Sequence, residues 1–140
     1  MSKKLLIFDL DGTLVDSSSA IISTIQETLK LSGIEENNIQ ILRSFIGPTL
    51  TDTYGNYYGL SGEKLQNALD THKELFKKNG IIKNVPYNGI VEFLQEIRKK
   101  ATLAVATTKY TEDANAILKY VNLEIFDMVL GADDSMVGSD

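Results

Sequence analysis

Two aspartates, Asp9 and Asp11, are the side chains of this sequence best suited to chemistry. They follow the apolar run of residues 5–8, and Gly12 comes directly after them. Carboxylates this close repel each other, so both stay ionised near neutral pH only beside a cation or hydrogen-bond donors, and a divalent metal meets that need well. Gly12 permits a sharp turn that would leave backbone amides free to hold an anion. The segment therefore indicates a hard cation and a phosphate group at one site.

The same segment has other interpretations. Two acids one residue apart also occur in solvated loops, and such a pair does not by itself identify a reaction. An EF-hand loop is excluded, because there another residue separates the second acid from the glycine, whereas Gly12 directly follows Asp11. The sequence contains neither a G-x-x-x-x-G-K-[ST] phosphate loop nor a G-x-G-x-x-G dinucleotide fingerprint. Nucleotide-cofactor enzymes are therefore disfavoured.

Composition narrows the classes of partner. The net charge is -5, which disfavours a surface that must neutralise nucleic-acid phosphates. No apolar run approaches the length of a membrane span or of the hydrophobic region in a secretory signal. The cysteine count is 0, so disulfides, thiolate zinc sites and cysteine nucleophiles are excluded. We expect a cytoplasmic protein with a small-molecule partner and no nucleic-acid or membrane partner.

The elements that must position Asp9 and Asp11 can be read from the hydrophobic pattern. A buried strand should end near Asp9, and helical spacing recurs through residues 15–82. A helix opening at Asn88 and Gly89 should then bury Phe93, and the apolar run of residues 103–107 reads as a second strand. Another helix and a strand over residues 125–130 follow, with the helix beginning near Thr111. This order predicts an α/β fold with a parallel sheet and right-handed crossovers.

Chain spacing indicates an insertion between the first two strands. Asp9 and Thr107 follow the two strands and are 98 residues apart, whereas a βαβ unit needs only about 30 residues. Because ligands bind where parallel strands end, both residues should lie at one sheet edge. We interpret residues 15–82 as a helical lid that excludes water from that edge.

Residues 9–17 resemble motif I of the haloacid dehalogenase superfamily, and residues 104–109 are similar to its second motif. Residues 45–50 resemble a stretch of the helical cap in the phosphoglycolate-phosphatase-like branch, and residues 87–89 resemble the turn where the chain re-enters the core. The resemblance implies a Rossmann-like parallel core formed by residues 1–14 and 83–140. It likewise implies an inserted helical cap formed by residues 15–82.

The resemblance also implies a mechanism for a Mg2+-dependent phosphatase of a small phosphorylated metabolite such as phosphoglycolate. Asp9 would be the nucleophile and form an aspartyl-phosphate, and Asp11 would be the general acid and base. Both aspartates would hold Mg2+, Asp9 through its side chain and Asp11 through its backbone carbonyl. The residues expected around the phosphoryl group are Gly12, Thr107, Thr108 and Lys109.

Two alternatives to a phosphatase remain open. A capped phosphomutase would keep Asp9 and Asp11 but return the phosphoryl group to a sugar. A non-catalytic phosphoryl-acceptor or interaction module would also place an aspartate at a strand end, although the long gap to Thr107 argues against it. A dehalogenase is disfavoured, because it needs no acid at position 11. Nothing in the pattern indicates the oligomeric state.

Two motifs of the superfamily have no counterpart in this chain. A lysine and an acidic pair normally lie beyond the third strand, yet residues 131–140 contain no Lys or Arg. Lys109 should replace the missing cation in part, and Asp133 and Asp134 should be solvated surface residues. We expect a chain that is incomplete at its C-terminus, with an uncovered apolar sheet face and little activity on its own.

Several other polar residues are explained by packing or solvation. His72 lies on the apolar face of the helix expected over residues 61–80 and should pack there. Tyr54, Tyr57 and Tyr58 recur at helical spacing and should fill the interior of the cap. The cations of residues 98–100 suit the last turn of a helix, where the macrodipole favours positive charge.

Overall fold

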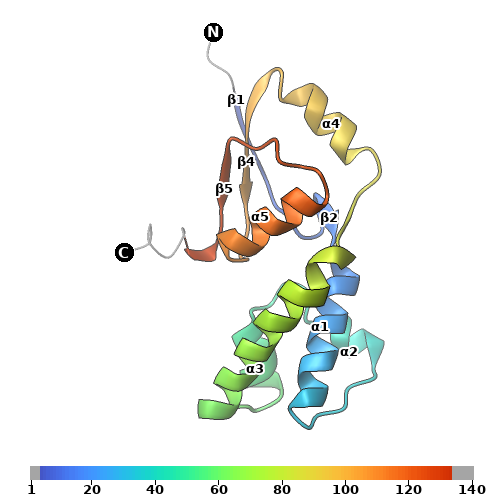
Figure 1. Cartoon of the computed structure of the whole chain (residues 1–140), viewed down its shortest axis with the longest axis vertical. Coiled ribbons are helices and arrows are strands. Elements are labelled where there is room, and N and C mark those ends of the chain that lie inside the picture. The colour runs from blue at the N-terminus through green and yellow to red at the C-terminus, as the bar shows by residue number, and fades with distance from the viewer. Residues whose placement is uncertain (1–3, 134–140) are drawn as a thin grey trace. The chain divides into compact units, whose positions relative to one another are not determined.

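The computed structural model describes residues 4–133, and its internal contacts divide the chain into two compact units (Figure 1). The sheet unit comprises the described parts of Met1–Ser17 and Asn84–Asp140, and the helical unit comprises Ser18–Lys83. No helix within the described residues is both long and apolar enough to cross a membrane.

Three parallel strands form the centre of the sheet unit. They are β1 (Lys4–Phe8), β4 (Ala101–Ala106) and β5 (Met128–Leu130), in the order β1-β4-β5. Phe8 pairs with Val105, and Val105 pairs with Val129, so the carboxyl ends of all three strands lie at one edge (Figure 1). Helices α4 (Ile90–Ile97) and α5 (Thr111–Tyr120) precede and follow β4. The expected parallel α/β fold is confirmed.

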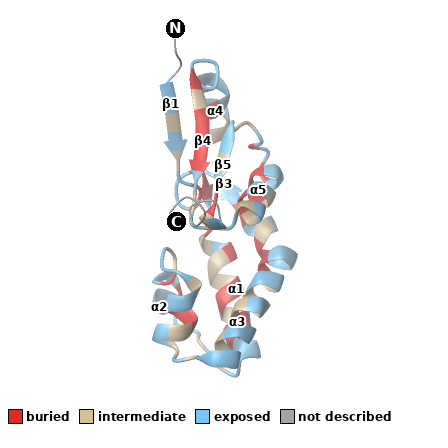
Figure 2. Ribbon diagram, turned by 90° about the vertical axis from the view of Figure 1, so that its left-hand side faces the viewer, coloured by how far each residue is buried: buried red, intermediate tan, exposed pale blue. Residues whose placement is uncertain are grey.

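Burial in the sheet unit is greatest in its central strand. Leu103 and Val105 of β4 are fully buried, and α5 buries its apolar face at Ile117 and Leu118, as its sequence pattern predicts (Figure 2). The expectation for α4 was only partly right. Leu94 is fully buried, but Phe93, which was expected to be buried beside it, is 49% exposed. Leu94 is the single buried residue of this eight-residue helix.

One face of the sheet is apolar, and its residues in the two outer strands, β1 and β5, are exposed. Ile7, Ala104 and Met128 form one cross-strand row, and the side chains of Ile7 and Met128 are 60% and 44% exposed. Leu5 and Leu130 extend the same face and are also exposed. An apolar face of this kind was expected from the sequence.

The helical unit contains three α-helices and three short helices of other types. They are α1 (Ser18–Leu31), α2 (Ile39–Arg43), the π-helix η1 (Asp52–Tyr57), α3 (Gly62–Leu75), the π-helix η2 (Phe76–Gly80) and the 3-10 helix η3 (Ile81–Lys83). Helix α1 packs against α3 and η2. Its buried residues Ile25 and Leu29 form one core with Leu42, Phe45 and Tyr54.

One expected helical segment begins as a strand instead. Val15 and Asp16 form β2 (Val15–Asp16), which pairs antiparallel with β3 (Val85–Pro86). The backbone of these residues is therefore satisfied by a segment distant in sequence, and α1 begins only at Ser18. No local helical pattern reveals such a partner.

Candidate active site

The loop that follows β1 is held by its own backbone. Leu10 is fully buried, and its carbonyl accepts from Leu14 N at 3.0 Å and from Val15 N at 3.2 Å. The chain therefore turns back sharply into β2. The two aspartates on either side of Leu10 differ in exposure, because Asp9 is exposed and Asp11 is half-buried.

Gly12 supplies the turn in this loop. Its φ is +80°, in the left-handed region that glycine adopts without strain. Its amide donates to Val15 O at 2.9 Å, so this donor is already engaged within the loop. The sequence suggested that backbone amides of this loop stay free to hold a phosphate group. The amide of Gly12 is not free, because it is bonded to Val15 O.

The two carboxylates are held in different ways. Leu10 N donates to Asp9 Oδ1 at 2.8 Å, which fixes that carboxylate beside the backbone. Asp11 Oδ2 lies 3.6 Å from Lys109 Nζ. The other oxygen, Asp11 Oδ1, is buried and has no hydrogen-bond partner among residues 4–133. A buried acceptor without a partner is uncommon and is often explained by an ion or water.

Thr107 and Lys109 lie in the loop that follows β4. Thr107 N donates to Leu130 O at 2.9 Å, and Lys109 N donates to Thr107 Oγ1 at 3.2 Å. A hydroxyl that accepts from an amide still has its own proton to donate. Thr108 lies between them and is exposed. The structure thus brings Lys109 to Asp11, while no contact of Thr108 with either aspartate is described.

Asp133 is a residue whose role the sequence did not reveal. Its Oδ1 accepts from Thr111 N at 2.9 Å and from Thr111 Oγ1 at 2.7 Å. Asp133 is exposed, as expected, but its carboxylate also bonds the first residue of α5, which was not expected. Asp133 lies after β5 and is distant in sequence from Thr111, the first residue of α5, to which it is bonded. The Tyr110 side chain, at the capping position of α5, makes no capping bond. Asp134 lies outside the described residues.

Asp9 and Asp11 together form a candidate Mg2+ site. No group of three or more His, Cys, Asp or Glu side chains that could hold a metal occurs within residues 4–133. Mg2+ is nevertheless often bound through one or two carboxylates together with substrate phosphate and water. The Asp9 side chain and the Asp11 backbone carbonyl are hard oxygen ligands, and the unpartnered Asp11 Oδ1 is a buried polar acceptor in the same loop. This donor set fits Mg2+.

The aromatic residues of the helical unit divide between core and surface. Tyr54 is fully buried and its hydroxyl lies 2.8 Å from His72 Nδ1, so both take the packing role expected of them. Burial raises the pKa of Tyr54 despite its hydrogen bond to Thr28. Tyr58 is half-buried and donates to Glu36. The expectation for Tyr57 was wrong, because its side chain is 56% exposed although its ring makes edge contacts with Phe45 and Tyr58.

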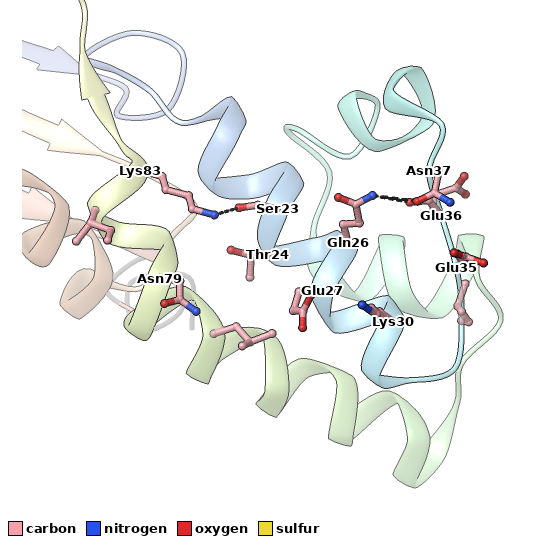
Figure 3. A pocket seen from close by; sticks show the side chains of 13 residues that line it. Ser23, Thr24, Gln26, Glu27, Lys30, Glu35, Glu36, Asn37, Asn79 and Lys83 are labelled. Carbon is pink, nitrogen blue, oxygen red and sulfur yellow. Dashed lines mark hydrogen bonds between the residues drawn. The ribbon is translucent and has the colours of Figure 1, made fainter.

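A cavity of about 590 Å³ lies within the helical unit (Figure 3). It is lined by α1, by the loop that follows α1, by the end of α3, and by η2 and η3, and Lys83 Nζ donates to Ser23 Oγ. Polar side chains such as Glu27 and Asn79 line the cavity. None of the candidate catalytic residues lines it.

The sequence was also compared with known proteins. Residues 6–137 match the family model of the haloacid dehalogenase-like hydrolases. The chain belongs to this family. A solved haloacid dehalogenase-like family hydrolase from Streptococcus pneumoniae superimposes with a TM-score of 0.85 at 28% identity, covering 98% of this chain and 68% of that chain.

Two curated relatives are similar over much of the sequence. A 5'-nucleotidase of Pseudomonas aeruginosa is 35% identical over 105 residues, which are 74% of this chain and 48% of that protein. A phosphoglycolate phosphatase of Aquifex aeolicus is 31% identical over 137 residues, covering 93% of this chain and 61% of that protein. The chain of this haloacid dehalogenase-like hydrolase thus spans about half to three-fifths of the length of these relatives.

Proposed function

We propose that this haloacid dehalogenase-like hydrolase is a Mg2+-dependent phosphatase acting on a small phosphorylated metabolite. The observation that carries the proposal is the pairing of Asp11 with Lys109, which joins the loops after β1 and β4 beside the exposed Asp9. Two curated relatives are named as a 5'-nucleotidase and a phosphoglycolate phosphatase, both of which act on phosphate monoesters. Phosphoglycolate is therefore one candidate substrate.

Asp9 is suited to the role of nucleophile. One of its oxygens accepts from Leu10 N, which leaves the other to attack phosphorus in line. The new O–P bond forms an aspartyl-phosphate as the bond from phosphorus to the leaving oxygen breaks. Splitting hydrolysis in this way gives two displacements, each with a lower barrier than direct attack by water.

Asp11 is suited to the proton transfers. It gives its proton to the leaving oxygen in the first step and takes a proton from the attacking water in the second. That water displaces Asp9 from phosphorus and releases inorganic phosphate. Lys109, 3.6 Å from Asp11 Oδ2, keeps this carboxyl oriented between the two steps.

The remaining groups stabilise charge on the transferring phosphoryl group. Thr107 has a hydroxyl proton to donate, since its oxygen already accepts from Lys109 N. Asp9 and Asp11 would hold Mg2+, which when bound neutralises negative charge on the phosphoryl oxygens.

The test uses the full-length protein with p-nitrophenyl phosphate and phosphoglycolate in the presence of Mg2+. Asp9→Asn should abolish phosphate release from both substrates, because an amide cannot form the covalent intermediate. Asp70→Asn, which alters an exposed acid on α3, should leave the rates unchanged. Unchanged turnover in Asp9→Asn would reject the nucleophile. Isomerisation of a sugar phosphate without phosphate release would indicate a phosphomutase instead.

A further inference from the structure

Two segments of the sheet unit that follow different strands are bonded together at the candidate site. The loop after β4 contains Thr107 and Lys109, and Leu130 is the last residue of β5, followed by Gly131 and Ala132. Thr107 N donates to Leu130 O at 2.9 Å, and Ala132 N donates to Lys109 O at 2.7 Å. The loop after β4 is therefore bonded to the end of β5 through Thr107 and to the residues after β5 through the carbonyl of Lys109.

Asp133 completes this attachment at the far end of the loop. Its Oδ1 accepts both the amide and the hydroxyl of Thr111, the first residue of α5. A carboxylate at a helix N-terminus also interacts favourably with the helix dipole. The residue at the capping position, Tyr110, makes no side-chain capping bond. Asp133 thus caps this helix from a segment distant in sequence.

The two segments approach too closely for an ordinary side chain between them. A Cβ added to Gly131 would lie 2.7 Å from Lys109 O and within a similarly short distance of Thr111 Oγ1. Contacts this short require the backbone to move. The close approach therefore depends on glycine at position 131, and it keeps Asp133 within hydrogen-bond reach of Thr111.

We propose that Asp133 is a positioning residue for the reaction, an inference that rests on the proposed phosphatase function. It contacts no reacting group and acts through Thr111, holding the loop so that Lys109 Nζ stays 3.6 Å from Asp11 Oδ2. A lysine side chain has many rotamers, and a fixed backbone limits the volume that its ammonium group explores. Misplacement by about 1 Å near a reacting centre is enough to slow catalysis by orders of magnitude.

The first test compares Asp133→Ala with Asp133→Asn in the full-length protein. Asp133→Ala should lower kcat for p-nitrophenyl phosphate by at least about 10-fold and change KM less, whereas Asn keeps an oxygen acceptor and should restore most of the rate. Glu124→Ala removes an exposed acid of the same unit and should have no effect. Equal losses in Asp133→Ala and Asp133→Asn, or none in either, would overturn the assignment.

The second test asks whether Asp133 acts through Lys109. In a Lys109→Met background, Asp133→Ala should lower kcat no further, whereas additive losses would show an unrelated structural effect and overturn the proposal. The 13C resonance of the Asp11 carboxyl gives a readout that needs no activity. It should shift in Asp133→Ala in the same direction as in Lys109→Met, and an unmoved resonance would also overturn the proposal. If the Asp11 resonance shifts but the wild type hydrolyses no phosphate ester, the proposed phosphatase function fails while the positioning of Lys109 by Asp133 stands.

Discussion

Asp11 Oδ2 and Lys109 Nζ lie 3.6 Å apart although they follow different strands of the sheet. Their side chains are 21% and 18% exposed, so the pair is shielded from much of the solvent that weakens surface ion pairs. The second oxygen of Asp11 has no hydrogen-bond partner in the described part of the chain. The carboxyl is thus oriented through one oxygen while the other stays available.

Replacing Asp11 tests its role as general acid. Asp11→Asn should slow phosphoglycolate hydrolysis by about 100-fold or more, the usual contribution of general acid catalysis. The loss should be smaller with p-nitrophenyl phosphate, because nitrophenolate is a good leaving group that needs little protonation. Steady-state rates with both substrates give the comparison. Equal losses for the two substrates would assign Asp11 a role other than proton donation.

Removing the hydroxyl of Thr107 tests phosphate contact. Thr107→Val deletes one donor to a charged group, an interaction of about 1.5–3 kcal/mol, so kcat/KM should fall about 10- to 100-fold. The change should also raise the inhibition constant of inorganic phosphate. Thr102→Val serves as the control. Thr102 lies in β4, the strand that precedes the loop containing Thr107. Wild-type phosphate inhibition in Thr107→Val would show that this hydroxyl does not touch the substrate.

Gly131→Ala should destabilise the sheet unit. The added methyl would press on Lys109 O and Thr111, so we expect a loss of about 1–3 kcal/mol in the free energy of unfolding, as for other overpacked sites. Gly55→Ala is the matched control. A Cβ there meets nothing closer than Leu65 at 3.6 Å, and alanine should raise stability by about 0.5–1 kcal/mol. Urea denaturation measures both, and an unchanged midpoint in Gly131→Ala would contradict the close approach.

Alkaline pH should destabilise the helical unit. Burial raises the pKa of Tyr54, and burial together with the hydrogen bond to Glu36 raises the pKa of Tyr58. A raised pKa in the folded state means that stability is complete below about pH 10, where unfolded tyrosine is protonated, and falls as pH rises further. The pH dependence of unfolding should become shallower in Tyr54→Phe but not in Tyr120→Phe, an exposed control. Equal slopes in all three proteins would argue against this linkage.

The parts of the fold that the sequence predicted correctly are those that depend on patterns among neighbouring residues. The apolar run before Asp9 and the residues around Thr107 indicated adjacent parallel strands, because each pattern needs only neighbouring residues to be read. β2 could not be foreseen, since its pairing depends on Val85 and Pro86 far along the chain. Asp133 was missed for the same reason, as its partner Thr111 precedes β5.

The misjudged aromatic residues have another cause. Phe93 and Tyr57 lie at positions where helical spacing predicts burial, but spacing identifies a face of a helix and not what covers it. At both positions the neighbouring elements leave much of the ring exposed. Burial is decided by tertiary contacts, which no periodic pattern contains.

The antiparallel pair of β2 and β3 brings together the two places where the chain leaves and re-enters the sheet unit. Asp16 and Val85 are direct cross-strand partners, so Ser17 and Asn84 stand where a two-residue hairpin loop would stand. An Asn-Gly turn in place of residues 17–84 would therefore join Asp16 to Val85 without changing the register of either strand. The helical unit is in this sense an insert, and exchanging it for another would leave the sequence of the proposed phosphate site in the sheet unit unchanged.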